Sequence, residues 1–401
     1  MSRVKRVVAL VAIWLSYVGL YLNRRNISVA IPAIMDYMGL THAEAGLLVT
    51  LFFVAYAATQ IPSGWLADVK GGKRTLVFGN LLTSAAGYLS GLASSYHPLA
   101  VTRLLCGIGQ GAGWPSSSKL VSEYFPRERR GFAMGFLTSS TALGSFLALV
   151  VSGLILQSYG WRMVFMVPAV ILLIPTAFLL FIVREPKVVN EENYGEGSWR
   201  RDLLAEVLKD SGVRKTAVSY FFWKYSFEGL IYWLPTLLVE TYMVDLGYAA
   251  LLTGCITLTG LVSMPLGGYL SDKIGSRARV AILSLTAMGV LMLALSTTAD
   301  LATTLVILFT ACFIMEMSES IYFTIPVDRL GLEAAGTSVG MINLIGQVGS
   351  LTAPWIIGLF VDIYHSYRYA VMLLGVSALL GAIPLATLRS PDKGGWVRSP
   401  G

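Results

Sequence analysis

The chain has 401 residues, of which 55% are apolar or aromatic and only 13% are charged. Soluble domains carry about 25% charged residues, so this composition excludes a soluble enzyme, a disordered chain and a disulfide-bonded scaffold. The net charge of +7 would suit a nucleic-acid-binding protein if the chain were soluble. The three cysteines lie inside apolar runs, and we expect them to be small packing residues without disulfides.

Apolar segments of helical length recur along the chain between short polar breaks. A helix crosses a bilayer with about 20 apolar residues, and these runs are too long for the strands of an outer-membrane barrel. We therefore predict an all-α membrane protein with twelve transmembrane helices, the first retained rather than cleaved as a signal peptide. The predicted spans are 7–36, 44–66, 75–95, 99–124, 131–157, 161–184, 214–239, 249–270, 280–298, 301–326, 335–361 and 368–388.

The basic residues predict how the chain is oriented. The termini, the central loop and the loops on their side hold nearly all of the Lys and Arg, whereas the opposite loops hold only Arg162 and Arg368. Basic loops stay in the cytoplasm, so we expect a multi-pass protein of the cell membrane with both termini cytoplasmic. The positive charge then reflects orientation, and no nucleic-acid partner is expected.

The chain also predicts two related halves. Three short patterns recur in the same order about 205 residues apart, as expected for an internal duplication. The polar stretch between the halves predicts an N-terminal half at 1–184, a cytoplasmic linker at 185–212 and a C-terminal half at 213–401. Two pseudo-symmetric six-helix bundles of this kind are typical of alternating-access transporters. The repeated patterns are Gly64–Asp68 with Gly268–Asp272, Gly131–Gly135 with Gly336–Gly340, and Trp161-Arg162 with Tyr367-Arg368.

The loop from Gly64 to Arg74 resembles the pattern G-x-L-[AS]-D-[RK]-x-G-[RK]-[RK] of the major facilitator superfamily, and its second copy starts at Gly268. Glycine permits a tight turn, and a carboxylate at a helix end can pair with nearby arginines. The resemblance implies a latch that holds one conformation of the two halves, while a solvated turn is the alternative. The expected latch residues are Gly64, Asp68, Lys70, Lys73, Arg74, Gly268, Asp272, Lys273 and Arg277.

Three segments resemble the anion:cation symporter family within this superfamily: Tyr21–Ser28, Arg103–Gly111 and Tyr124–Arg129. The resemblance implies import of organic anions such as sugar acids and other carboxylates, usually with protons. The sequence departs from the family where Asn23 replaces a common aspartate and Gln110 replaces a common glutamate. Both amides lack the proton that a carboxyl group would carry.

Two arginines inside predicted spans are the main candidates for substrate contact. A basic residue at mid-span costs roughly 2.5–3.5 kcal/mol on insertion, so it usually faces a cavity or a partner. The guanidinium groups of Arg24 and Arg103 present planar forks suited to a carboxylate or phosphate. The alternative is that they pair with Glu316, Glu319 or helix carbonyls and only hold the halves together.

The predicted seventh span carries Lys224 and Glu228 one turn apart, where they form an ion pair or, alternatively, bind substrate and proton. Glu228, Glu316 and Glu319 are the proton-coupling candidates, because desolvation and a neighbouring acid raise the pKa of a carboxyl group. Further polar side chains are expected either to complete the pocket or to join helices. They are Tyr56, Gln60, Asn343 and Gln347.

No feature of the sequence predicts a cofactor, a metal site or an enzyme. The Gly-rich pattern at 107–112 follows no strand, and no phosphate-binding lysine motif occurs. We therefore predict a proton-coupled secondary transporter of a small organic anion of carboxylate or sugar-acid type, monomeric in the lipid bilayer. The alternatives are an organophosphate or phosphate exchanger of the same superfamily and a non-transporting membrane sensor.

Overall fold

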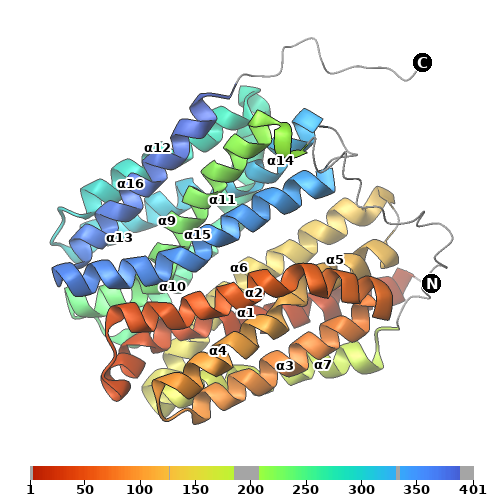
Figure 1. Cartoon of the computed structure of the whole chain (residues 1–401), viewed down its shortest axis with the longest axis horizontal. Coiled ribbons are helices and arrows are strands. Elements are labelled where there is room, and N and C mark those ends of the chain that lie inside the picture. The colour runs from red at the N-terminus through yellow and green to blue at the C-terminus, as the bar shows by residue number, and fades with distance from the viewer. Residues whose placement is uncertain (1–2, 126, 185–206, 331–334, 389–401) are drawn as a thin grey trace. The chain divides into compact units, whose positions relative to one another are not determined.

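The computed structural model describes residues 3–125, 127–184, 207–330 and 335–388. Within these ranges the chain is built from helices and contains no strand, which confirms the predicted all-α architecture (Figure 1). The helices are α1 (Arg3–Met38), α2 (His42–Lys70), α3 (Gly72–Leu92), α4 (Tyr96–Gly111), α5 (Gly113–Tyr124), α6 (Arg127–Tyr159), α7 (Trp161–Phe181), α9 (Ser211–Tyr242), α10 (Leu246–Leu258), α11 (Gly260–Ile274), α12 (Arg277–Leu295), α13 (Leu301–Glu316), α14 (Glu319–Leu330), α15 (Ala335–Tyr364) and α16 (Tyr367–Ala386).

Three of the predicted spans contain two helices each, namely α4 with α5, α10 with α11 and α13 with α14. In the first case Pro115 lies in the opening turn of α5 and has no N–H to donate to the preceding turn, so α4 ends at Gly111. In the third case the indole Nε1 of Trp223 donates to the Met315 carbonyl at 3.1 Å, next to the break. A single apolar run therefore does not guarantee an unbroken helix.

Side-chain caps fix where several helices begin. Thr41 and Glu44 form a reciprocal capping box at α2, in which each side chain accepts a hydrogen bond from the other's backbone N–H. At α13 the carboxylate of Asp300 accepts from the N–H of Thr303 at 2.7 Å. Hydrogen bonds from Thr303 and Ala302 lower the pKa of Asp300. Both helices thus begin at a residue that satisfies N–H groups left free in the first turn.

Nine helical segments of the described chain are long and apolar enough to cross a membrane. Large apolar side chains also stand exposed on these segments, such as Phe181 (86% exposed) and Val306 (67% exposed). Outward-facing apolar side chains of this kind suit lipid rather than water as the surrounding medium. The chain is therefore a multi-pass membrane protein.

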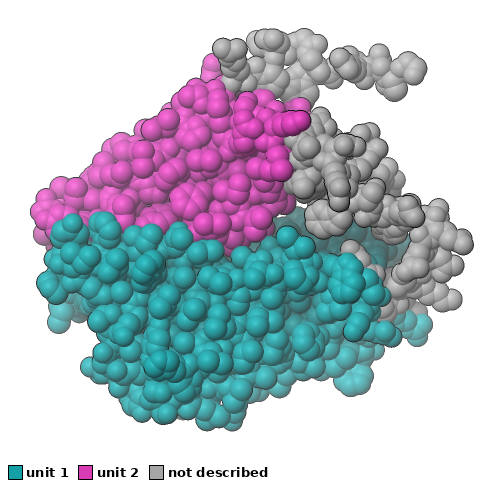
Figure 2. Space-filling view, in the orientation of Figure 1, with its two compact units in different colours: residues 1–193, 231–258, 351–367 teal, residues 194–230, 259–350, 368–401 magenta. Residues whose placement is uncertain are grey.

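The chain divides into two compact units, which Figure 2 colours separately. Unit 1 comprises residues 1–193, 231–258 and 351–367, and unit 2 comprises 194–230, 259–350 and 368–401. Helix α9 therefore belongs to unit 2 up to Leu230 and to unit 1 from Ile231. The predicted boundary at 185–212 stays a prediction, because residues 185–206 lie outside the described ranges.

In unit 1, helix α1 packs against α6 and α7, while α2 packs against α4. The α2–α4 contact is close because α4 carries glycine: a Cβ on Gly107 would lie 2.3 Å from the Phe52 carbonyl oxygen. Only a residue without a side chain fits at this distance. The contact brings the ring of Phe52 beside the polar residues of α1 and α4.

Candidate functional site

Arg24 of α1 is 6% exposed and is surrounded by aromatic rings. Its guanidinium carbon lies 4.5 Å from the ring centroids of both Tyr21 and Tyr56 and 5.7 Å from that of Phe52. Its Nε donates a hydrogen bond of 2.9 Å to the Oε1 of Gln110 on α4. Cation–π contacts and one neutral amide therefore hold this charge.

Arg103 of α4 is 1% exposed and lies beside the ring of Phe52, which is also a neighbour of Arg24. Its guanidinium carbon is 4.9 Å from the centroid of the Phe52 ring, so Arg24 and Arg103 share this aromatic neighbour. Its Nη1 reaches the backbone carbonyl of Asn23 at 3.5 Å, which is a long hydrogen bond. The structure thus brings the two predicted arginines together within unit 1.

Neither arginine forms an ion pair with any carboxylate that the structure describes. The predicted alternative partners are engaged elsewhere: Glu319 pairs with Lys224, and Glu316 accepts from Thr259. Within these two arginines, three guanidinium nitrogens are buried without a hydrogen-bond partner, namely Arg24 Nη2, Arg103 Nε and Arg103 Nη2. Buried cations without a carboxylate partner are costly, and here aromatic rings, a neutral amide and a backbone carbonyl are the groups that face the two guanidinium groups.

The two amides that replace the family's carboxylates hold the helices in place. Asn23 donates to the backbone carbonyls of Gly19 and Pro168, both at 3.0 Å. Gln110 donates from Nε2 to the Leu20 carbonyl at 3.0 Å while its Oε1 accepts from Arg24. These hydrogen bonds need an N–H donor at both positions. An ionised carboxylate could not donate them.

Among the other residues predicted for this pocket, Tyr56 contacts Arg24 and Gln60 lies half-buried on the same helix with an unpartnered Nε2. Sequence reasoning missed Tyr21 and Phe52 as neighbours of the arginines. Their spacing carries the signal, because Tyr21 precedes Arg24 by one helical turn and Phe52 precedes Tyr56 by one turn. An aromatic residue one turn from a buried arginine is a useful indicator of such a cage.

Unit 2 contains a basic group of a different kind. The Nζ of Lys224 lies 3.0 Å from Glu319 Oε1 and 3.8 Å from Glu228 Oε1. The ion pair expected between Lys224 and Glu228 is therefore present, and a shorter one to α14 accompanies it. Indole and phenol rings of Trp223 and Tyr220 lie 4.9 and 5.5 Å from the ammonium group.

The remaining polar candidates of unit 2 have separate partners. Glu316 is 3% exposed at the end of α13 and accepts a hydrogen bond of 2.9 Å from Thr259 at the α10–α11 break. The break after α13 places Glu316 and Glu319 on different helices, contrary to the expectation of one continuous helix. On α15, Gln347 donates to Asn343 at 3.5 Å and keeps an unpartnered Oε1.

The expected latch residues lie on the helices that flank two turns, the one between α2 and α3 and the one between α11 and α12, and Gly64 and Gly268 lie within α2 and α11 rather than in the turns. Gly71 and Gly275 adopt positive φ angles of 98° and 68° there, a backbone conformation that glycine readily adopts. In unit 2, Arg277 pairs with Asp272 at 2.7 Å and with Asp328 of α14 at 2.9 Å. Arg277, Asp272 and Asp328 all belong to unit 2, so these ion pairs join helices of the same unit.

The corresponding turn of unit 1 is tied differently. Lys73 donates to the Leu180 carbonyl at 2.8 Å, whereas Lys70, Arg74 and Lys273 are exposed. Gly64 approaches Pro115 of α5, and Gly268 has open space beside it. The side chain of Asp68 lies outside the described residues.

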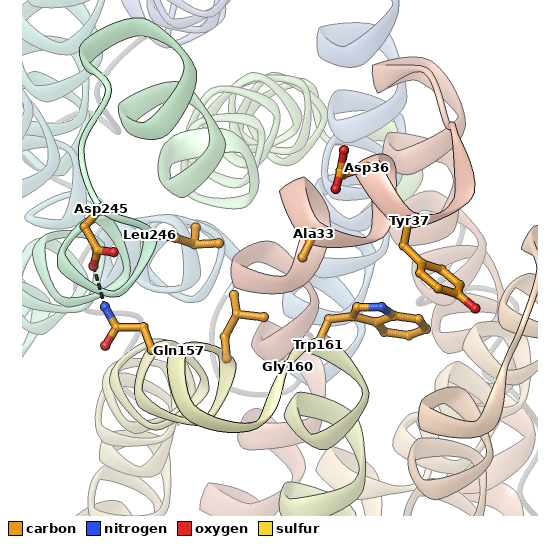
Figure 3. A pocket seen from close by; sticks show the side chains of 9 residues that line it. Ala33, Asp36, Tyr37, Gln157, Gly160, Trp161, Asp245 and Leu246 are labelled. Atoms are coloured by element: carbon orange, nitrogen blue, oxygen red, sulfur yellow. Dashed lines mark hydrogen bonds between the residues drawn. The ribbon is translucent and has the colours of Figure 1, made fainter.

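A surface cavity of about 740 Å³ opens in unit 1, where the ends of α1 and α6 meet the starts of α7 and α10 (Figure 3). Trp161 and Tyr37 line one side, and Asp245 with its hydrogen-bonded partner Gln157 lines the other. The cavity contains none of the predicted site residues. Its charged lining residues are Asp36 and Asp245, which would repel an anion.

The comparisons with known proteins agree with this architecture. The sequence profile described as Major Facilitator Superfamily matches residues 13–354. The chain is 33% identical to a probable sulfoacetate transporter of Cupriavidus necator, over 96% of this chain and 95% of that protein. It is 26% identical to the membrane sensor protein UhpC of Escherichia coli, over 95% and 92% of the two chains.

A solved structure shows the same fold. It is a bacterial homologue of the human lysosomal transporter Spinster, with a TM-score of 0.85 and 18% sequence identity. The match covers 96% of this chain and 97% of that one. At this identity the likeness shows the fold alone.

Proposed function

The chain belongs to the Major Facilitator Superfamily, and from that premise we propose that Arg24 and Arg103 form the site at which it binds its substrate. It is a secondary transporter of small organic anions rather than an enzyme. The observation that carries the proposed site is the pair of buried guanidinium groups, which meet no carboxylate among the described residues. A bound anion would supply the charge that the protein itself does not.

The unpartnered nitrogens favour an anion with several oxygen atoms. Arg24 Nη2, Arg103 Nε and Arg103 Nη2 are three buried donors without a hydrogen-bond partner, and the two guanidinium groups share the ring of Phe52 as a neighbour. A sulfonate or carboxylate accepts such bonds at each of its oxygens, and hydrogen bonds to charged groups are stronger than neutral ones. The relative named as a probable sulfoacetate transporter supports a small substrate that carries a carboxylate, a sulfonate or both.

Proton coupling is proposed to reside in unit 2. Protonation of Glu319 would remove its charge and weaken the 3.0 Å pair with Lys224, which would leave the ammonium free to attract a substrate. Glu228 is the second acid on the same lysine, and Glu316 is a buried acid held by Thr259. Unit 1 offers no such acid beside Arg24, because Asn23 and Gln110 do not titrate.

The remaining assignments complete the proposed picture. The protein resides in the cell membrane as a monomer surrounded by lipid, with both termini in the cytoplasm. Tyr56 and Gln60 in unit 1, and Asn343 and Gln347 in unit 2, are proposed as further polar contacts for the substrate, each within its own unit. The turns around Gly71 and Gly275 act as latches through residues such as Asp272 and Arg277.

Uptake of labelled sulfoacetate into proteoliposomes containing the full chain tests the proposal. We expect accumulation driven by an inward proton gradient, and loss of uptake when Arg24 is replaced by glutamine. Uptake that is unchanged in Arg24→Gln would contradict the proposed site. Binding without accumulation would instead indicate a sensor.

The organophosphate or phosphate exchanger remains the second candidate, because arginines without titratable neighbours also suit exchange. Counterflow separates the two. Vesicles preloaded with phosphate should accelerate uptake of a labelled sugar phosphate if the protein is an exchanger. Under our proposal, preloaded phosphate has no effect, and collapse of the proton gradient abolishes accumulation.

A further inference from the structure

A cluster of charged residues at the start of α2 belongs to none of the sites described above. Both ring nitrogens of His42 face carboxylates: Nδ1 lies 2.8 Å from Asp362 Oδ1, and Nε2 lies 3.0 Å from Glu240 Oε2. Glu240 is near the end of α9, and Asp362 is near the end of α15. One imidazole therefore connects three helices within unit 1.

The geometry specifies the protonation state of this ring. A neutral imidazole has one N–H and one lone pair, so it can donate to only one of two carboxylates and must repel the other. An imidazolium donates from both nitrogens and satisfies both carboxylates at the observed distances. Both hydrogen bonds therefore form together only when both ring nitrogens of His42 are protonated.

The carboxylate of Asp362 also caps the helix on which His42 lies. Its oxygens accept from the backbone N–H of His42 at 2.9 Å and from that of Ala43 at 2.7 Å. A negative charge at a helix N-terminus is favourable. Asp362 therefore binds the backbone of α2 at any pH at which it is ionised, whereas the ring donates to Asp362 and Glu240 together only when both of its nitrogens are protonated.

Helices α2 and α15 touch closely along the segment that follows the cluster. A Cβ on Gly358 would lie 2.3 Å from the His42 carbonyl oxygen, and one on Gly46 would lie 2.3 Å from that of Pro354. Further along, Thr50 donates to the Leu351 carbonyl at 2.6 Å. The backbones of α2 and α15 are thus in direct contact at Gly46 and at Gly358.

The other groups around the imidazole are aromatic. The rings of Trp233 on α9 and Tyr367 on α16 lie 5.6 and 6.0 Å from that of His42. The charged and titratable groups that face the ring are therefore Glu240, Asp362 and the phenol of Tyr367. On α2 itself, Glu44 is engaged in the helix cap with Thr41. The ion pairs described for Glu240 and Asp362 both go to His42.

We propose that His42, Glu240 and Asp362 form a proton-operated clamp that holds the start of α2 against the ends of α9 and α15. The predicted orientation places this clamp on the outer face of the membrane. Since α2 belongs to the predicted N-terminal half and α9 and α15 to the other, alternating access requires these contacts to part at some stage. The inference thus rests on the proposed transport cycle, but not on the arginine site.

The direction of the effect follows from linkage. The clamped state binds the proton on His42 more tightly than an open state, in which the ring faces water and no carboxylate. A state that binds a proton more tightly is favoured as the pH falls. The clamp is therefore closed in an acidic medium and weakens as the pH rises through the titration of histidine.

Distance measurements by pulsed electron spin resonance test the clamp in the full chain, reconstituted in lipid nanodiscs. Spin labels are placed on Ser94→Cys and on Met243→Cys, two exposed loop positions in the predicted N- and C-terminal halves, with Cys255 replaced by alanine. We expect the ratio of short to long distances to fall by about tenfold between about pH 5.5 and pH 8, which brackets the histidine range. In His42→Gln the ratio should stay constant over this range.

His97→Gln is the matched control, because His97 is an exposed histidine at the start of α4 and should leave the pH dependence unchanged. Glu240→Gln is a second test that keeps both His42 and the cap on α2. It replaces one of the two carboxylates with a neutral amide and so removes one negative charge beside the imidazolium, and the midpoint of the distance change should therefore move to lower pH. Distances that do not depend on pH in the unmodified chain, or a midpoint unmoved in Glu240→Gln, would overturn the proposal, whatever Arg24→Gln does to sulfoacetate binding.

Discussion

The buried cations of the two units are neutralised in different ways. In unit 1, Arg24 and Arg103 lie among aromatic rings and neutral amides, and no described carboxylate pairs with them. In unit 2, Lys224 lies between two glutamates of its own unit. The first group lacks a counter-charge, while the second group already has one.

This difference suggests a division of work between the units. A cation with no internal partner attracts an anion permanently, because neither an arginine nor an amide neighbour changes charge near neutral pH. A lysine that is shared by two carboxylates responds to the proton occupancy of those carboxylates. Unit 1 is thus suited to substrate recognition, and unit 2 is suited to coupling recognition to protons.

The strongest test of this comparison removes the positive charge from unit 1. Arg24→Gln should lower the rate of sulfoacetate uptake by about 100-fold, since each hydrogen bond to a charged group contributes roughly 1.5–3 kcal/mol. Initial rates of labelled uptake in proteoliposomes measure the loss. Arg162→Gln is the control, because Arg162 lies near the protein surface beside Tyr37 and should leave the rate unchanged.

A second test acts on unit 2 and separates coupling from binding. Glu319→Gln should reduce gradient-driven accumulation by about tenfold or more, because the neutral amide cannot release or take up the coupling proton. Exchange of labelled for unlabelled sulfoacetate across the membrane should persist, since it needs no net proton movement. Accumulation that survives in the double variant Glu316→Gln/Glu319→Gln would exclude this pair of acids from coupling.

A third test converts unit 1 to the chemistry of unit 2. In Gln110→Glu a carboxyl group would take the place of the amide whose Oε1 lies 2.9 Å from Arg24 Nε, and its ionised form would compete with the substrate for the guanidinium. Sulfoacetate affinity should therefore fall by about tenfold as the pH rises through the titration of this glutamate and recover when it is protonated. Gln110→Met, which adds no titratable group, should show no such pH dependence in the same binding titrations.

The smallest effect is expected at an ion pair that serves only the structure. Arg329 contacts Asp210 through Nε and Nη2 at 3.1 and 3.2 Å. Partial burial opposes ionisation of Asp210, but hydrogen bonds from Arg329 and the Val213 amide outweigh it and lower the pKa of this carboxyl. Its contribution to stability is therefore present near neutral pH and is lost as the pH falls through that lowered pKa.

For this partly buried pair the loss in Asp210→Asn should be about 1 kcal/mol of unfolding free energy. Thermal unfolding in detergent measures it. Sulfoacetate uptake should stay unchanged. A loss of uptake in this variant would show that ion pairs outside the Lys224 group also take part in the transport cycle.

Much of this architecture could be predicted from the sequence, because a membrane-spanning helix requires an apolar run along most of its length. The all-α fold and the candidate arginines could be predicted from runs of apolar residues and the charges within them, whereas the superfamily was predicted from the resemblance of the loop from Gly64 to Arg74 and its second copy. The break after Gly111 was missed although Pro115 gives a local signal for it, whereas the break after Glu316 lies beside a contact between helices, that of Trp223 with the Met315 carbonyl, which the sequence does not show. Periodicity carries no information about a partner on another helix.

In the sites, too, contacts between different helices could not be predicted from the sequence. The bond between Lys224 and Glu228 follows from their spacing on one helix, but the shorter bond to Glu319 joins residues far apart in the chain. The cluster of His42, Glu240 and Asp362 likewise draws on three helices, and the sequence shows each member only as a polar residue near a loop. Long-range polar contacts became visible only with the structure.

Calorimetric titration of sulfoacetate into the purified full chain tests the central claim most directly. The account predicts saturable binding to the unmodified protein, with glucose as an uncharged control that does not bind, and an affinity reduced by about 100-fold in Arg24→Gln and in Arg103→Gln. Binding of equal affinity in all three proteins would contradict it, because the buried guanidinium groups would then have no part in holding the anion.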